Sequence, residues 1–185
     1  EVERSLKVLD GCVVIFDAVS GVESQSETVW RQADRYHVPR MCYINKMDRL
    51  GADFYGTFKQ ILERLGAHPV AIQLPVGAEA AFEGVVDLLN RTVRVYLDEQ
   101  GIQYEDRPLA GEISGELDAK VREWRAHLIE RVAEADEKIM EKYIHDQEPA
   151  VEELKAAIRR ATIAGRIVPV LCGSSAKNKG VQLLL

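Results

Sequence analysis

The stretch at 45–48, Asn-Lys-Met-Asp, holds residue types suited to reading a nucleotide base, and it directly follows the apolar run at 41–44. Guanine presents its N1–H and its N2 amino group side by side, so one carboxylate can accept both hydrogen bonds. Asp48 is the candidate acceptor, Lys46 can lay its aliphatic stem along the base, and Asn45 can offer its amide to the far edge while tying neighbouring loops together. The stretch therefore predicts a guanine-reading loop at the end of a strand.

Discrimination against adenine follows from the same chemistry. Adenine lacks both donors and would leave the Asp48 carboxylate unpaired. A site built around such hydrogen bonds rejects an analogue that lacks them by roughly 10⁴-fold or more. An ordinary polar turn is the alternative interpretation, because these residue types are common in turns.

A second polar loop favours the guanine interpretation. Residues 173–177, Gly-Ser-Ser-Ala-Lys, follow the apolar run at 167–172. Small side chains at Ser174, Ser175 and Ala176 would let backbone N–H groups approach guanine O6, an acceptor that adenine replaces with a donor. Taken alone, this loop could simply cap a following helix, but paired with the loop at 45–48 it is expected to contact the base.

Composition and charge limit the other classes of function. Of the 185 residues, 46% are apolar and 29% are charged, which suits a globular core. The formal net charge of −6 disfavours a polyanion-binding surface, so we expect no direct nucleic-acid site. No apolar run reaches membrane-spanning length and no signal peptide is recognised, so we expect a cytoplasmic protein without a membrane partner. The cysteines are expected to be reduced core residues, and the histidines show no metal-ligand spacing.

Apolar periodicity predicts an α/β fold. The runs at 12–16 and 41–44 are typical of buried parallel strands, with helical patterns before, between and after them. Such alternation predicts a doubly wound sheet, in which ligands bind at the carboxyl ends of the strands. The run at 167–172 restores this pattern near the end of the chain.

The alternation breaks after Gly66. Short segments with Gly and Pro between them predict antiparallel strands at 70–74, 85–87, 92–97 and 103–108. A charged helical tract is expected from about 114 to 164. The sequence therefore predicts an α/β domain with a parallel sheet formed by 1–65 and 167–185, carrying an inserted α+β subdomain at 66–166.

The helical tract carries acidic residues at three- and four-residue spacing: Glu130, Glu134, Glu137 and Glu141. If the helix is continuous, these carboxylates lie along one face. A solvated face is the simpler interpretation, and a docking face for a basic partner is the alternative.

Long stretches of the chain resemble bacterial elongation factor G. They are FDAVSGVESQSETVWRQA at 16–33, INKMDRLGADF at 44–54, IQLPVGAE at 72–79 and GSSAKNKGVQLLL at 173–185. The resemblance implies a P-loop GTPase fold that binds GTP or GDP, with Mg²⁺ in the parent protein. It also implies guanine-binding roles for Asn45, Lys46, Asp48 and Ser174. Ser175 stands where the family usually has Ala, a change that a role carried by backbone N–H tolerates.

The resemblance also implies partners. The block at 66–166 is similar to the family's insertion in the GTPase domain, which is associated with the ribosomal stalk protein. The implied function is movement of tRNA and mRNA on the ribosome during protein synthesis. A paralogue acting in ribosome recycling or ribosome protection is an alternative, as is a ribosome-interaction module without enzymatic activity.

The residues for phosphate chemistry are missing. GTP hydrolysis needs a GxxxxGK[ST] loop, and this chain contains no Gly-Lys dipeptide. The resemblance places the phosphate loop, the switch segments and the Asp-x-x-Gly-His before Glu1. We therefore expect an internal fragment that holds no catalytic residue and no Mg²⁺ ligand and is inactive alone. Loss of the neighbouring strand would leave the strand at 12–16 with an unpaired apolar edge, which favours self-association.

Overall fold

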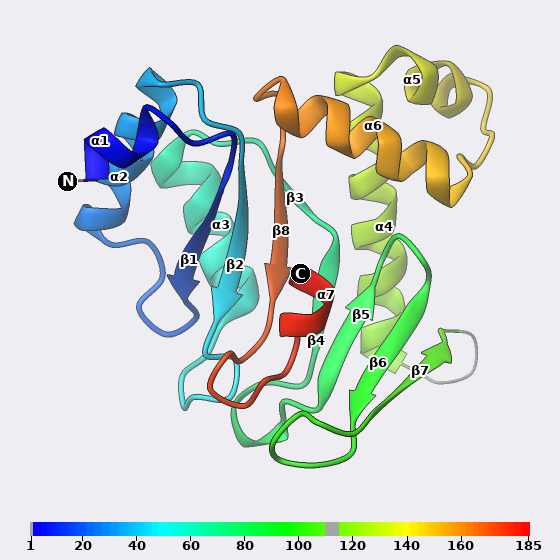
Figure 1. The fold of residues 1–185 in the computed structure, drawn as a ribbon. Helices are drawn as coiled ribbons and strands as arrows, with labels where there is room; N and C mark the ends of the chain where they lie inside the picture. Colours follow the sequence, from blue (N-terminus) through cyan, green and yellow to red (C-terminus); the bar gives the residue numbers. More distant parts are fainter. Residues whose placement is uncertain (1, 110–114) are drawn as a thin grey trace.

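The computed structural model describes residues 2–109 and 115–185, and in them a parallel sheet stands beside an antiparallel sheet (Figure 1). This confirms the α/β class with a parallel sheet and a separate antiparallel sheet. The parallel sheet has the order β1-β2-β8-β3, with β1 (Cys12–Asp17), β2 (Arg40–Asn45), β8 (Val168–Cys172) and β3 (Pro69–Ala71). The antiparallel sheet has the order β4-β5-β6-β7, with β4 (Gln73–Val76), β5 (Gly84–Asp87), β6 (Thr92–Tyr96) and β7 (Tyr104–Pro108).

Helices α3 (Phe54–Leu65) and α4 (Gly115–Ala135) lie behind the sheets in the view of Figure 1, and α7 (Val181–Leu184) lies in front of them. Helix α3 begins where the Asp53 side chain accepts the Gly56 N–H and ends at Gly66, whose φ of 60° suits glycine. None of the helices in the described residues is both long and apolar enough to cross a membrane. The helices are α1 (Val2–Leu6), α2 (Ser24–Arg35), α3 (Phe54–Leu65), the 3₁₀ turn η1 (Glu79–Ala81), α4 (Gly115–Ala135), α5 (Glu137–Ile144), α6 (Val151–Ile163) and α7 (Val181–Leu184).

One strand prediction was wrong. The segment at 70–74 was expected to be a single antiparallel strand, but it is divided between the two sheets. β3 pairs in parallel with β8, whereas β4 pairs antiparallel with β5. Ile72 lies between the two strands, and its N–H donates to Val170 of β8 while its C=O accepts from Leu88. The division of the chain at 66 and 166 remains a prediction, but the strand that follows Gly66 extends the parallel sheet.

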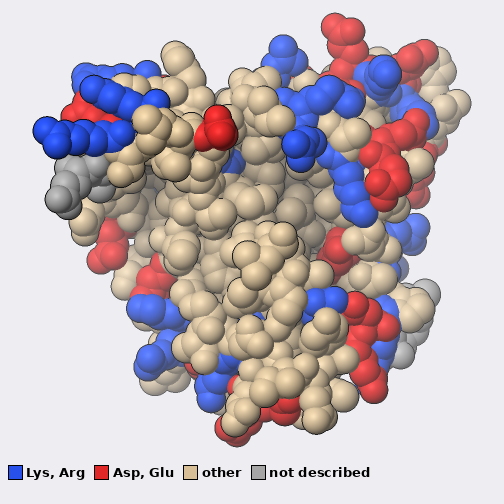
Figure 2. All heavy atoms as spheres, in the orientation of Figure 1, with Lys and Arg blue, Asp and Glu red and all other residues tan. Residues whose placement is uncertain are grey.

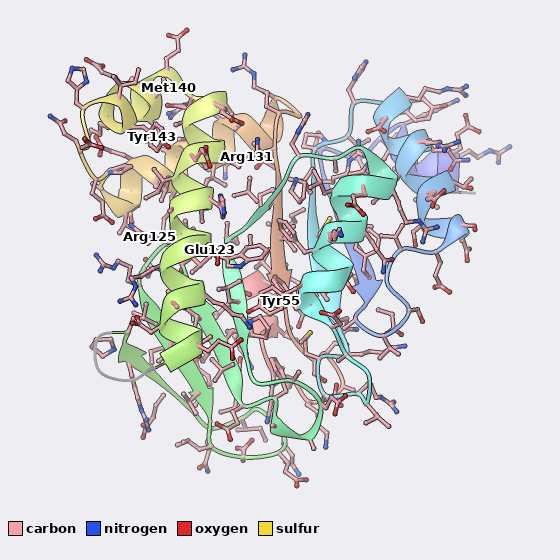
Figure 3. All side chains as sticks on the ribbon, turned by 180° about the vertical axis from the view of Figure 1, so that it is seen from behind. Tyr55, Glu123, Arg125, Arg131, Met140 and Tyr143 are labelled. Atoms are coloured by element: carbon pink, nitrogen blue, oxygen red, sulfur yellow. The ribbon has the colours of Figure 1, made fainter. Side chains whose placement is uncertain are left out.

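An aromatic cluster joins α3 to α4 at the rear of the molecule. The Trp124 ring lies 4.8 Å from that of Phe58 and 5.5 Å from that of Tyr55, measured between centroids. Tyr55 projects from α3 towards α4 (Figure 3), and the Lys120 ammonium lies over its ring. Most of the buried apolar side chains belong to one cluster that spans both sheets, α3, α4 and α6, and a small second cluster joins Leu6, Ala33 and Val38. The expected insertion therefore shares its core with the parallel sheet.

The acidic face expected along one continuous helix is not formed. The helical tract breaks at Asp136, whose side chain accepts the N–H of Ile139 and starts α5. Asp136 also pairs with Arg160 of α6 at 2.6 Å, which fixes the break. The expected carboxylates are therefore divided between α4, with Glu130 and Glu134, and α5, with Glu137 and Glu141.

The apolar edge expected at 12–16 is present. β1 stands at the end of the strand order in the parallel sheet, and the side chains of Val13 and Ile15 are 43% and 62% exposed. In the view of Figure 2, uncharged residues cover the middle of the molecule. Self-association through the edge remains a prediction.

Candidate guanine-binding site

Three parallel strands end at the same edge of the sheet, where the candidate loops leave them. The register pairs Asp17 of β1 with Asn45 of β2, and Ile44 of β2 with Cys172 of β8. The loops that follow β2 and β8 are therefore neighbours, as the sequence predicted (Figure 1).

Asn45 joins the two loops through a reciprocal pair of hydrogen bonds with Ser175. The Asn45 Nδ2 donates to Ser175 Oγ, and the backbone N–H of Ser175 donates to Asn45 Oδ1, each over 2.9 Å. The backbone adds two further links, from the Gly173 N–H to the Ile44 C=O and from the Met47 N–H to the Gly173 C=O. The loop-tying role expected of Asn45 is thus present in the structure.

Lys46 reaches across the end of β1 to Asp17. Its Nζ lies 2.5 Å from Asp17 Oδ2, while Asp17 Oδ1 accepts the N–H of Val19 at 2.8 Å. Partial burial raises the pKa of the Asp17 carboxyl, but the hydrogen bonds from Lys46, Val19 and Ser20 outweigh it and hold that pKa below its usual value. The carboxylate is therefore ionised at neutral pH and fixes the end of the lysine side chain beside the end of β1.

Asp48 is the charged residue of the stretch at 45–48 that forms no ion pair within the described part of the chain. Its carboxylate is half-buried, and it has no hydrogen-bond or ion-pair partner among residues 2–109 and 115–185. A carboxylate that no protein group engages is free to accept hydrogen bonds from the donors of a ligand. Guanine presents two adjacent donors, N1–H and the N2 amino group, which one carboxylate can accept together, so the residue types present fit this base.

Ser174, Ser175 and Ala176 occupy different positions in the second loop. Ser174 is fully buried, and its hydroxyl accepts the Lys177 N–H at 3.3 Å. Ala176 is exposed, and its N–H has no partner among the described residues. Ser174 therefore shapes the loop, while the backbone N–H of Ala176 is left available as a donor.

The second loop is closed by tight backbone contacts around Gly173. A Cβ at this position would overlap the Tyr43 hydroxyl and the Lys179 carbonyl oxygen. Burial raises the pKa of Tyr43, so its hydroxyl stays neutral and donates to that carbonyl at 3.2 Å. Only glycine fits here, because the loop is packed directly against β2.

Asp17 was not identified as a site residue from the sequence. The available signal was its position directly after an apolar strand whose neighbour ends at Asn45. Its partnership with Lys46 depends on strand register, which a single sequence does not fix. Phosphate-binding residues remain absent from the sequence, and the described residues contain no cluster of three or more side chains able to hold a metal ion. These residues do not fit a Mg²⁺ site.

Comparison with known proteins agrees with this geometry. A family model described as the elongation factor Tu GTP binding domain matches residues 1–185. A crystal structure of a protein from Thermus thermophilus superposes with a TM-score of 0.85 at 27% sequence identity, over 100% of this chain. The chain spans only 26% of the length of that protein. The family match covers the whole chain, and the chain therefore belongs to the family of the elongation factor Tu GTP-binding domain, the GTP-binding domain of translation factors.

Proposed function

We propose that this chain is part of a translational GTPase of the elongation factor G type and binds the guanine of GTP or GDP through the loops at 45–48 and 173–176. One observation carries the proposal. The Asn45–Ser175 pair joins the two loops, and the nearby Asp48 carboxylate is left without a partner among the described residues. A base with two adjacent donors completes that arrangement.

Each residue has a distinct role in this proposal. Asp48 accepts the guanine N1–H and N2 amino group and so selects GTP over ATP. Lys46, held at its end by Asp17, lays its stem along the base, and Asn45 fixes the second loop. In that loop Ser174 sets the backbone shape from its buried position, and the N–H groups of Ser175 and Ala176 face the guanine O6. The Ser175 N–H is already bonded to Asn45, so the Ala176 N–H is the more available donor.

Phosphate binding and hydrolysis belong to other parts of the full-length protein in this proposal. The chain has no Gly-Lys dipeptide and spans about a quarter of its structural relative. We therefore place the phosphate loop, the switch segments and the Mg²⁺ ligands outside it, and regard the chain alone as inactive. We assign the partial GTP-binding domain to 1–65 and 167–185 and the inserted subdomain to 66–166, whose first strand, β3, joins the parallel sheet.

The ribosome, including its stalk protein, is the proposed partner, and the cytoplasm is the proposed location. The stalk contact is placed on 66–166, which adds the antiparallel sheet and α4 to α6 to the parallel sheet. Chemical-shift mapping with the C-terminal domain of the stalk protein is expected to perturb this block and leave 45–48 unchanged. Absence of shifts in the block at near-millimolar partner would contradict the contact.

Activity of the full-length protein tests the proposal as a whole. It is expected to hydrolyse GTP, but not ATP, when ribosomes are added, and to advance tRNA and mRNA in a translocation assay. GTP hydrolysis accompanied by subunit splitting or drug release, without translocation, would favour a recycling or protection paralogue. If the full-length protein hydrolysed no nucleotide, the remaining alternative would be a ribosome-interaction module without enzymatic activity.

GDP binding by the isolated chain tests separately how much of the nucleotide affinity comes from the base and how much from the phosphates. Phosphates supply much of the affinity in such sites through backbone amides, lysine and metal. Calorimetry on the isolated chain is therefore expected to detect weak GDP binding or none. A submicromolar dissociation constant would show that the phosphate cradle is not needed.

A further inference from the structure

Glu79 holds both sides of the turn that carries Asp48. The backbone N–H of Glu79 donates to the Met47 carbonyl oxygen at 2.8 Å. Its side-chain Oε1 accepts the backbone N–H of Gly51 at 2.7 Å. Met47 precedes Asp48 and Gly51 follows it three residues later, so one residue fixes the turn at two points.

Met47 is also bonded to the loop that follows β8 of the parallel sheet. The Met47 N–H donates to the Gly173 carbonyl oxygen, and the Met47 side chain is fully buried. Glu79 is the corresponding contact from the antiparallel sheet, because it follows β4 after a short connection. The backbone on the N-terminal side of Asp48 is therefore bonded to β8's exit loop and to the segment after β4.

The backbone of the 77–82 turn is shaped to present Glu79. Glu79 has a φ of 58°, in the left-handed region that a residue with a Cβ rarely adopts. Gly77 has a φ of 74°, and a Cβ there would overlap the Ala81 carbonyl oxygen. Strained conformations of this kind persist where the surroundings hold them, and here the two bonds to the 45–51 loop do so.

We propose that Glu79 is a positioning residue for guanine recognition, holding the Asp48 carboxylate in the orientation that accepts both base donors. This inference rests on the proposed guanine-binding function. Glu79 does not touch the base and acts through Met47 and Gly51. Through Glu79, the stretch at 72–79 has a role in nucleotide binding. The composition and periodicity of the stretch do not indicate that role.

Inosine diphosphate provides a readout specific to Asp48. Hypoxanthine keeps the N1–H of guanine but lacks the N2 amino group, so it forms one of the two hydrogen bonds to the carboxylate. The ratio of the IDP to the GDP dissociation constant therefore measures how well Asp48 is aligned with both donors. A general loss of stability weakens both nucleotides together and leaves the ratio unchanged.

The experiment compares variants of the full-length protein for GDP and IDP binding. Glu79→Ala removes the acceptor, and Glu79→Met removes it while keeping the length of the side chain if the alanine variant folds poorly. Both are expected to lower the ratio at least threefold, with GDP losing more affinity than IDP. Glu79→Gln keeps an oxygen that can accept the Gly51 N–H and is expected to retain the wild-type ratio. Glu83→Ala, at an exposed position in the same segment, is the matched control.

The outcomes separate this inference from the function it rests on. A wild-type ratio in both Glu79→Ala and Glu79→Met, in a protein that prefers GDP, would overturn the positioning role alone. A wild-type protein that binds GDP and IDP, or GDP and ADP, equally well would contradict the proposed guanine site itself.

Discussion

Asn45 and Ser175 exchange two hydrogen bonds of 2.9 Å across loops that are 130 residues apart in the sequence. One of these bonds uses the backbone N–H of Ser175, which any residue except proline provides. The other uses the serine hydroxyl. A serine at this position therefore adds a side-chain bond to a link that the backbone already makes.

Ser175→Ala is expected to weaken GDP binding by the full-length protein about 2- to 10-fold, because removing one hydrogen bond of this type costs about 0.5–1.5 kcal/mol. The backbone bond to Asn45 remains, so binding is not abolished. Calorimetry or nucleotide displacement measures the change. Ser26→Ala, on α2, is the control, and an equal loss in that variant would show that the hydroxyl of Ser175 has no special role.

The Asp17–Lys46 pair predicts a specific dependence on pH. The pKa of Asp17 is held below its usual value of 3.8, so the folded state gains stability from the ionised form. That contribution is complete above the usual pKa and is lost as the pH falls through the lowered pKa of the folded state. A carboxyl-carbon NMR titration from neutral pH to about pH 2 is expected to find the Asp17 midpoint below that of an unstructured aspartate.

Asp17→Asn tests the same pair at neutral pH. It removes the charge that fixes Lys46 and is expected to weaken GDP binding a few-fold, since partly exposed ion pairs contribute up to about 1 kcal/mol. Glu23→Gln, an exposed carboxylate just before α2, is the control. Unchanged affinity in Asp17→Asn would mean that Lys46 is held by other contacts.

Much of the fold is predictable here because apolar runs mark the strands. The runs at 12–16, 41–44 and 167–172 are apolar enough to be recognised as strands without tertiary information, and the loops that follow 41–44 and 167–172 form the candidate site. Strand β3 was misassigned because it is only three residues long and a single residue, Ile72, separates it from β4. The change of sheet depends on hydrogen bonds of Ile72 to Val170 and Leu88, which are distant in the sequence.

Contacts between distant segments explain the remaining differences. The helix break at Asp136 depends partly on Arg160, which lies on another helix. The roles of Asp17 and Glu79 depend on strand register and on a turn with an unusual φ. Neither the strand register nor the turn can be read from local periodicity. In the sequence, Asp17, which holds Lys46, and Glu79, which bonds to the 45–51 loop, therefore look like any other polar loop residue.

The exposed edge at β1 predicts that the isolated chain self-associates. Ile15 is 62% exposed on a strand at the end of the parallel sheet, and unpaired edges favour pairing with another chain. Sedimentation across a concentration series is expected to show a growing dimer fraction, or hydrogen exchange to show rearrangement of residues 1–20. Ile15→Glu is expected to suppress the dimer.

Ile102→Glu is the matched control, because Ile102 is 66% exposed but lies outside this edge. It is expected to leave the dimer fraction unchanged. A strictly monomeric wild-type chain at high concentration, with residues 11–17 protected from exchange, would show that the edge is covered in another way.

Asp48 is the residue assigned to reading the base, and replacing guanine by xanthine tests that role directly. Xanthine carries a carbonyl at C2 where guanine carries an amino group, so a carboxamide suits xanthine as a carboxylate suits guanine. The measurement is the affinity of full-length wild type and Asp48→Asn for GDP and XDP. Wild type is expected to prefer GDP, and Asp48→Asn is expected to lose GDP affinity and gain XDP affinity. An unchanged ratio of the two affinities in Asp48→Asn would contradict the assignment of this loop.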